Sequence, residues 1–96
     1  MKLYLEFSVD YSGECEDYTL FIDDEERTHD FDFEDITDYI KKLENNVEDF
    51  SLSEHRTSGI VTITDDVMTI EYKYYTKPDW NEFEEHIITT TPIDFN

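Results

Sequence analysis

The chain has 96 residues, a length that suits a single domain with one hydrophobic core. It contains 26 acidic residues against seven Lys and Arg, which gives a formal net charge of -19 at pH 7. This charge disfavours nucleic acid, anionic lipid and acidic substrates as direct partners, because the long-range field repels them, and it favours a basic partner. Hydrophobic residues make up 38% of the chain, with seven Tyr and seven Phe, which indicates a folded domain and not a disordered acidic chain.

Cysteine usage and the absence of long apolar runs predict a cytoplasmic protein. Cys15 is the only cysteine, so no internal disulfide is expected and a reducing compartment fits. Its neighbours Glu14 and Glu16 favour a raised thiol pKa, so we expect a buried or inert cysteine. Residues 1–9 alternate apolar and polar, unlike a signal peptide, and no run approaches membrane-spanning length.

The first third of the chain predicts a β-hairpin. Residues 1–9 alternate between apolar and polar positions, as a half-buried strand does. Residues 10–17 read as a turn around Gly13, and residues 18–22 as a second short strand that pairs antiparallel with the first. Residues 23–30 contain no periodic apolar position and are expected to form a loop.

The strongest local pattern predicts a helix from about Phe33 to Glu48. Asp32 is a good N-cap, and Asp35 three residues later can complete a capping box. Apolar residues then recur at three- and four-residue spacing, which places them on one stripe of a helix. The residues of this stripe are expected in the core: Ile36, Tyr39, Ile40, Leu43, Val47 and Phe50.

The second half of the chain predicts two more strands and a short helix. Residues 60–64 and 67–75 are rich in β-branched and aromatic residues, with a tight turn at Asp65-Asp66 between them. After Pro78, Asp79 can cap a short helix over residues 80–86, and the run before Pro92 allows one further edge strand. We therefore expect residues 1–96 to form a single acidic α+β domain. Its mostly antiparallel sheet would have four or five strands in ββαββ order, with one main helix packed on it and a short C-terminal helix.

The sequence contains no motif for catalysis or metal binding. With this many acids, nearly any spacing of paired carboxylates occurs by chance, so a solvated face is the expected interpretation. Asp30, Asp32 and Glu34 alternate as an EF-hand loop begins, but Asp35 and Lys41 replace its Gly and its final Glu. The three His lie far apart, and no nucleophile elbow or Gly-rich phosphate loop is present. We expect a protein that is not an enzyme and needs neither cofactor nor metal.

The charge itself suggests a binding mode. A folded chain of this length has a diameter of roughly 30–35 Å, and duplex DNA of that length carries about 20 phosphates. The net charge of -19 is close to that value. Such a globule can occupy a basic groove built for nucleic acid, where its carboxylates pair with Arg and Lys that normally hold phosphates.

Three acidic segments support a resemblance to a known class: DDEE at Asp23–Glu26, DFDFED at Asp30–Asp35 and EFEEH at Glu82–His86. With the small size and the many Asp, Glu, Asn, Ile and Tyr residues, they make the chain similar to phage-encoded DNA-mimic inhibitors. That class includes anti-restriction proteins, uracil-DNA glycosylase inhibitors and several anti-CRISPR proteins. The resemblance concerns composition over the whole chain, and because these inhibitors do not share one fold it implies nothing about topology.

This resemblance implies a non-catalytic inhibitor whose DNA-mimicking surface blocks the basic nucleic-acid-binding groove of a host nuclease, such as a CRISPR effector. It would act in the host-cell cytoplasm, bind neither nucleic acid nor membrane directly, and be a monomer or a homodimer. An immunity or antitoxin protein that neutralises a basic toxin or nuclease is the alternative. The residues expected to contact the partner are Asp23, Asp24, Glu25, Glu26, Asp30, Asp32, Glu34, Asp35, Trp80, Glu82 and Glu85.

Overall fold

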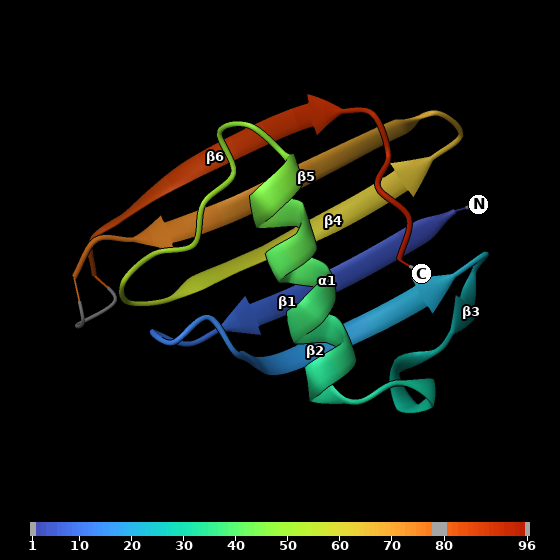
Figure 1. Cartoon of the computed structure of the whole chain (residues 1–96), viewed down its shortest axis with the longest axis horizontal. Coiled ribbons are helices and arrows are strands. Elements are labelled where there is room, and N and C mark those ends of the chain that lie inside the picture. Colours follow the sequence, from blue (N-terminus) through green and yellow to red (C-terminus); the bar gives the residue numbers. More distant parts are fainter. Residues whose placement is uncertain (1, 78–80, 96) are drawn as a thin grey trace.

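One antiparallel sheet and one helix make up the fold of the computed structural model, which describes residues 2–77 and 81–95 (Figure 1). The strands and helices are β1 (Leu3–Val9), β2 (Cys15–Ile22), β3 (Glu25–Glu26), the 3₁₀ turn η1 (Thr28–Asp30), α1 (Phe33–Asn46), β4 (Thr57–Thr64), β5 (Val67–Tyr75) and β6 (Phe83–Thr90). The strand order is β3-β2-β1-β4-β5-β6, and α1 lies across one face of the sheet. The predicted α+β class with one main helix is confirmed.

The centre of the sheet is β1, which pairs with β2 on one side and β4 on the other. Leu5 lies opposite both Leu20 and Val61, and all three side chains are buried on the face that α1 covers. On β4, a Cβ atom at Gly59 would lie 2.5 Å from the backbone oxygen of Glu71, so this close approach of β4 and β5 requires glycine. The alternation expected for residues 1–9 is therefore present over Leu3–Val9, and it directs one face of the sheet into the core.

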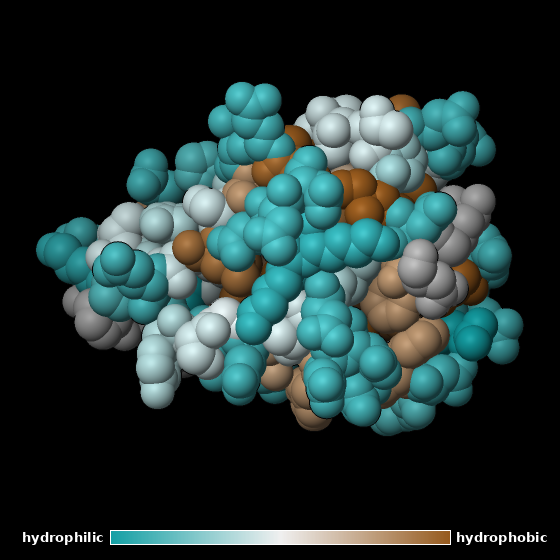
Figure 2. All heavy atoms as spheres, in the orientation of Figure 1, coloured by the Kyte–Doolittle hydropathy of each residue, from teal (hydrophilic) through white to brown (hydrophobic). Residues whose placement is uncertain are grey.

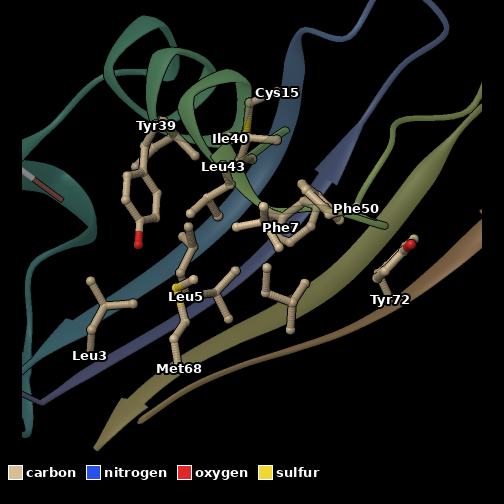
Figure 3. Packing of buried hydrophobic residues seen from close by; sticks show 14 of the residues in the cluster. Leu3, Leu5, Phe7, Cys15, Tyr39, Ile40, Leu43, Phe50, Met68 and Tyr72 are labelled. Atoms are coloured by element: carbon tan, nitrogen blue, oxygen red, sulfur yellow. The ribbon is translucent and has the colours of Figure 1, made fainter. Parts of the chain in front are cut away.

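The core lies between α1 and the sheet, as the helical stripe predicts. All six residues of that stripe are buried, and Figure 3 shows Tyr39, Ile40 and Leu43 pointing toward Leu5 and its neighbours. Phe50 meets Tyr72 edge to face at 4.9 Å between ring centroids. At the start of α1 the capping box is formed: the Asp32 carboxylate accepts from the Asp35 N–H at 2.9 Å. The predicted helix and its N-cap are confirmed, although α1 ends two residues earlier than expected.

The segment expected to be a loop after β2 is ordered in a tight hairpin. Asp23 and Asp24 form a two-residue turn with φ of 52° and 68°, and Glu25 and Glu26 then pair with Ile22 and Phe21 as β3. Asp tolerates this left-handed conformation better than most residues, which is why the turn forms without glycine. With β6, this short strand brings the sheet to six strands, so the expected count of four or five was too low.

The prediction of a short C-terminal helix was wrong. Phe83, Glu84, Glu85 and His86, expected to be helical, begin the eight-residue strand β6, which pairs antiparallel with β5 along its length. Trp80, where that helix was to start, and its cap Asp79 lie outside the described residues. A helix of seven residues is marginal by itself. The free edge of β5 offers a full ladder of backbone hydrogen bonds. The expected C-terminal edge strand therefore begins earlier, at Phe83, and pairs with β5.

Residues 91–95 return across the helical face beside α1 (Figure 1). The Tyr39 hydroxyl donates to the Ile93 carbonyl at 2.7 Å, and Phe95 packs against Phe31 with 4.8 Å between ring centroids. Burial raises the pKa of the Tyr39 hydroxyl.

Within the described part of the chain, no helix has the length and apolar character needed to cross a membrane.

Candidate functional site

Eight of the eleven predicted contact residues lie on one edge of the molecule, which we call the acidic edge. It comprises the β2–β3 turn, β3, η1 and the first turn of α1, and every one of these eight carboxylates is exposed. Figure 2 shows hydrophilic side chains around η1 and along the outer side of α1. The residues of the acidic edge are Asp23, Asp24, Glu25, Glu26, Asp30, Asp32, Glu34 and Asp35.

Hydrogen bonds to β2 hold this edge in place. The Tyr18 hydroxyl lies 2.8 Å from the Thr28 carbonyl and 2.5 Å from the Phe31 carbonyl, positions from which it can donate to either. The Leu20 N–H donates to the Thr28 hydroxyl at 2.9 Å, and the Arg27 N–H donates to the Leu20 carbonyl at 2.7 Å. The segment expected to be a loop therefore presents its carboxylates from a backbone that is anchored on both sides of η1.

Cations neutralise part of the acidic edge. The Lys2 ammonium lies 2.8 Å from a carboxylate oxygen of Asp24, and this hydrogen bond raises the pKa of Lys2. The Lys2 N–H also donates to Asp23 at 2.9 Å, and Arg27 pairs with Asp30. Asp32 and Asp35 are engaged in the capping box. Within the described residues, no hydrogen bond or ion pair engages the side chains of the remaining three, Glu25, Glu26 and Glu34. These carboxylates are therefore best placed to meet the cations of a partner protein.

Phe33 is a contact candidate that the list of predicted residues omits. It begins α1 between Asp32 and Glu34, its side chain is 52% exposed, and its ring meets Tyr18 edge to face at 5.3 Å. Exposed aromatic residues flanked by charge are favoured anchors of protein interfaces. The signal in the sequence is its place between two acids, Asp32 and Glu34; its three-residue spacing from Ile36 would by itself predict a buried position.

Two of the remaining predicted residues, Glu82 and Glu85, lie at the opposite edge of the sheet. Glu85 is on β6, and Glu82 precedes that strand and pairs with Lys77 at 3.0 Å. Trp80 lies outside the described residues. Because β3 and β6 are the two edge strands of a six-stranded sheet, five strand spacings or about 24 Å separate them. The structure does not join Glu82 and Glu85 to the acidic edge.

Two further chemical features of the described residues concern metal ligands and the Cys15 thiol. They contain no group of three or more His, Cys, Asp and Glu side chains arranged to hold a metal ion. Burial raises the pKa of the Cys15 thiol to about 11, and the nearby charges of Asp17 and Glu16 add a smaller effect in the same direction. The raised pKa expected from the sequence is confirmed, but burial is its main cause and Glu14 has no part in it.

Comparison with known proteins adds no relative: no protein-family model, no curated protein and no solved structure matches the chain.

Proposed function

We propose that this protein is a non-catalytic inhibitor that binds the basic nucleic-acid-binding groove of a nuclease, such as a CRISPR effector, through its acidic edge. The observation that supports this most is the anchoring of the edge: eight exposed carboxylates follow one another along a hairpin, a 3₁₀ turn and a helix start that are hydrogen-bonded to β2. A preorganised surface loses less conformational entropy on binding than a flexible acidic loop.

The dimensions of the molecule fit a stretch of duplex DNA. Its extents are 36 × 27 × 21 Å, and 36 Å of duplex carries about 21 phosphate charges at one per ~1.7 Å. The net charge of -19 is of the same size. A groove that attracts such a duplex would attract this protein by the same field, which accelerates association at low salt.

Competition for DNA tests the proposal. A candidate nuclease is incubated with labelled target DNA, and the protein is titrated in at low and at moderate salt. We expect the protein to displace the DNA, with an inhibition constant that weakens as salt rises because ion pairs at the edge are screened. A protein that leaves DNA loading unchanged at low salt across a panel of nucleases and CRISPR effectors would contradict the proposal.

A pair of variants with equal net charge localises the contact. The first set neutralises the hairpin with Asp23→Asn, Asp24→Asn, Glu25→Gln and Glu26→Gln, which keeps residues that tolerate the left-handed turn. The control set is Glu48→Gln, Glu54→Gln, Asp65→Asn and Asp66→Asn, four exposed acids outside the acidic edge.

Both sets remove the same charge, so the long-range attraction between the protein and the nuclease changes equally, and only the local contacts differ. We expect the hairpin set to weaken inhibition by about tenfold or more, and the control set by much less. Equal weakening would show that net charge acts without a defined contact. Tight binding to a basic toxin or nuclease without competition for DNA would instead favour the immunity-protein alternative.

A further inference from the structure

The second face of the sheet, opposite α1, carries a groove of its own. We call it the open face. The groove has a volume of ≈ 940 Å³ and is lined by residues of β2, β1, β4, β5 and β6. Its side chains include Glu6, Asp17, Ile60, Glu71, Glu85 and Ile87. Antiparallel sheets often leave one face to water, and such faces are normally polar. This face differs because Ile87, Val67 and Phe83 are exposed on it, Ile87 to 71%.

One row across the strands alternates acid and isoleucine. Strand pairing places Glu6 opposite Ile60, Ile60 opposite Glu71, and Glu71 opposite Ile87. Neighbouring strands lie about 4.8 Å apart, so the four side chains lie at roughly 0, 5, 10 and 14 Å from Glu6, measured across the strands. Glu6 and Glu71 are therefore about 10 Å apart, with an isoleucine after each.

The charge of the groove is negative after its own cations are counted. Arg56 pairs with Glu16 at 2.6 Å and donates to the Ser8 hydroxyl at 3.0 Å. Lys73 lies over the Phe83 ring at 4.9 Å from its centroid, in a strand position opposite Glu85. Neither cation pairs with Glu6 or Glu71 among the described contacts. A second copy of the chain, itself at -19, is repelled from such a face, whereas a partner with both basic and apolar side chains fits it.

We propose that the open face takes a basic amphipathic helix of the partner protein. The spacing selects a helix over a strand. Side chains at i, i+3, i+7 and i+10 of a helix lie on one stripe at about 0, 4.5, 10.5 and 15 Å, which matches the row. Side chains on one face of a strand lie about 7 Å apart, which does not. Lys or Arg at i and i+7 meets Glu6 and Glu71, and aliphatic residues at i+3 and i+10 meet Ile60 and Ile87.

This inference rests on the proposed function and adds the element of the basic partner that is bound. Charges at an interface mainly steer and select, while affinity comes from a few buried apolar anchors. The acidic edge has one exposed aromatic residue, Phe33, whereas the open face combines exposed aliphatic residues with a groove. A helix docked there, with α1 on the other face, completes a three-layer arrangement around the sheet.

The test uses a synthetic peptide as the probe. It has about 18 residues, enough to form a helix, with Lys or Arg at i and i+7, Leu at i+3 and i+10, and Ala and Gln elsewhere. A scrambled peptide of the same composition keeps the charge and loses the stripe. Binding to the ¹⁵N-labelled full chain is followed by NMR at near-physiological salt. We expect saturable shifts at Glu6, Ile60, Glu71 and Ile87, and at least tenfold weaker binding of the scrambled peptide.

Matched variants separate contact from general charge. Glu71→Lys and Glu48→Lys change the net charge equally, but only Glu71 lines the groove. Ile87→Ser and Tyr11→Ser each remove an exposed apolar side chain, and Tyr11 lies in the β1–β2 loop. We expect Glu71→Lys and Ile87→Ser to weaken peptide binding by about tenfold, and the two controls to leave it nearly unchanged. The amide spectrum of each variant checks that it folds.

Several results would overturn the inference. These are shifts confined to residues 23–35, equal binding of the scrambled peptide, no saturable binding, or self-association of the free protein that Ile87→Ser abolishes. The last would make the open face an interface between copies. If the open-face shifts are present but the protein does not compete with DNA, the inhibitor function is refuted and the docking surface stands. If the protein competes with DNA but the open-face shifts are absent, only the docking surface is refuted.

Discussion

Four ion pairs among the described residues shape the surface more than they stabilise it. Their cations are Lys2, Arg27, Arg56 and Lys77. The Lys2–Asp24 and Lys77–Glu82 pairs join side chains that are all more than half exposed. Exposed pairs of this kind contribute little to stability, because water and salt screen them. At the acidic edge these pairs engage Asp24 and Asp30. With the Lys2 N–H on Asp23 and the capping box of Asp32 and Asp35, they leave the side chains of Glu25, Glu26 and Glu34 without a hydrogen bond or ion pair within the described residues.

Cys15 gives a prediction at the scale of one residue. Burial raises its thiol pKa from 9.0 to about 11. Thiolate is the reactive form, and its fraction falls about tenfold for each pH unit that the pKa rises. The native protein should therefore react with a thiol reagent at pH 8 on the order of 100-fold more slowly than the unfolded chain. Reaction with dithionitrobenzoate with and without denaturant measures this ratio, and equal rates would contradict a buried thiol.

The same shift fixes the direction of a pH effect on stability. The unfolded chain loses the thiol proton at lower pH than the folded chain does, so the stabilisation is fully present below pH 9.0 and declines as pH rises toward 11. In Cys15→Ala this component is absent. The difference in unfolding free energy between wild type and Cys15→Ala should accordingly shrink across this pH range.

At the scale of elements, α1 both supplies the core and presents charge. Its inner stripe is buried against the sheet, and its first turn carries Glu34 and Asp35. Acids at this end stabilise the helix, because the N-terminus is the positive end of its dipole. The exposed carboxylates at the helix start therefore have a structural role as well as the proposed binding role, and a mutation there has to separate the two.

Two substitutions at Asp32 separate these roles. Asp32→Ala removes the cap acceptor and should lower the free energy of unfolding by about 0.5–2 kcal/mol, whereas Asp32→Asn keeps an acceptor and should be nearly neutral. Both remove one negative charge, so the difference between them isolates the cap. Urea denaturation at fixed salt measures it. Equal stability of the two variants would mean that the capping box does not stabilise α1.

At the scale of the whole molecule, the core works against self-repulsion. A net charge of -19 on a globule with a radius of gyration of 12.7 Å destabilises the compact state, and the apolar layer between α1 and the sheet has to offset this. The acids are spread over both edges of the sheet and both of its faces, which limits the repulsion at any one place.

Salt should therefore stabilise this protein. Raising NaCl from about 10 mM to about 500 mM shortens the Debye length from about 30 Å to a few Å, so repulsion across the molecule is screened. We expect the melting temperature to rise by roughly 5–10 °C, which corresponds to 1–2 kcal/mol for a domain of this size. Choline chloride should give the same rise if screening is the cause. An unchanged or lower melting temperature in both salts would show that repulsion does not limit stability.

Much of the fold could be predicted from the sequence because it depends on local patterns. Period-two alternation in residues 1–9 and the stripe from Ile36 to Phe50 each predict one buried face. The first is confirmed over Leu3–Val9 and the second over its whole length. Eight of the eleven predicted contact residues lie together on the acidic edge because they all fall between positions 23 and 35, and their role in binding stays a prediction. The resemblance to DNA-mimic inhibitors and the inhibitor function remain predictions.

Other features depended on pairing between distant segments. Residues 83–86 carry a short helical pattern, but the free edge of β5 made them a strand. Glu85 and the acidic edge look alike in sequence, yet strand order puts them at opposite edges of the sheet. The row of Glu6, Ile60, Glu71 and Ile87 exists only because four strands align in register. The sequence alone determined local periodicity, caps and total charge, because these depend on near neighbours. Only the tertiary structure decided which charges and apolar side chains share a surface, because that follows from long-range strand pairing.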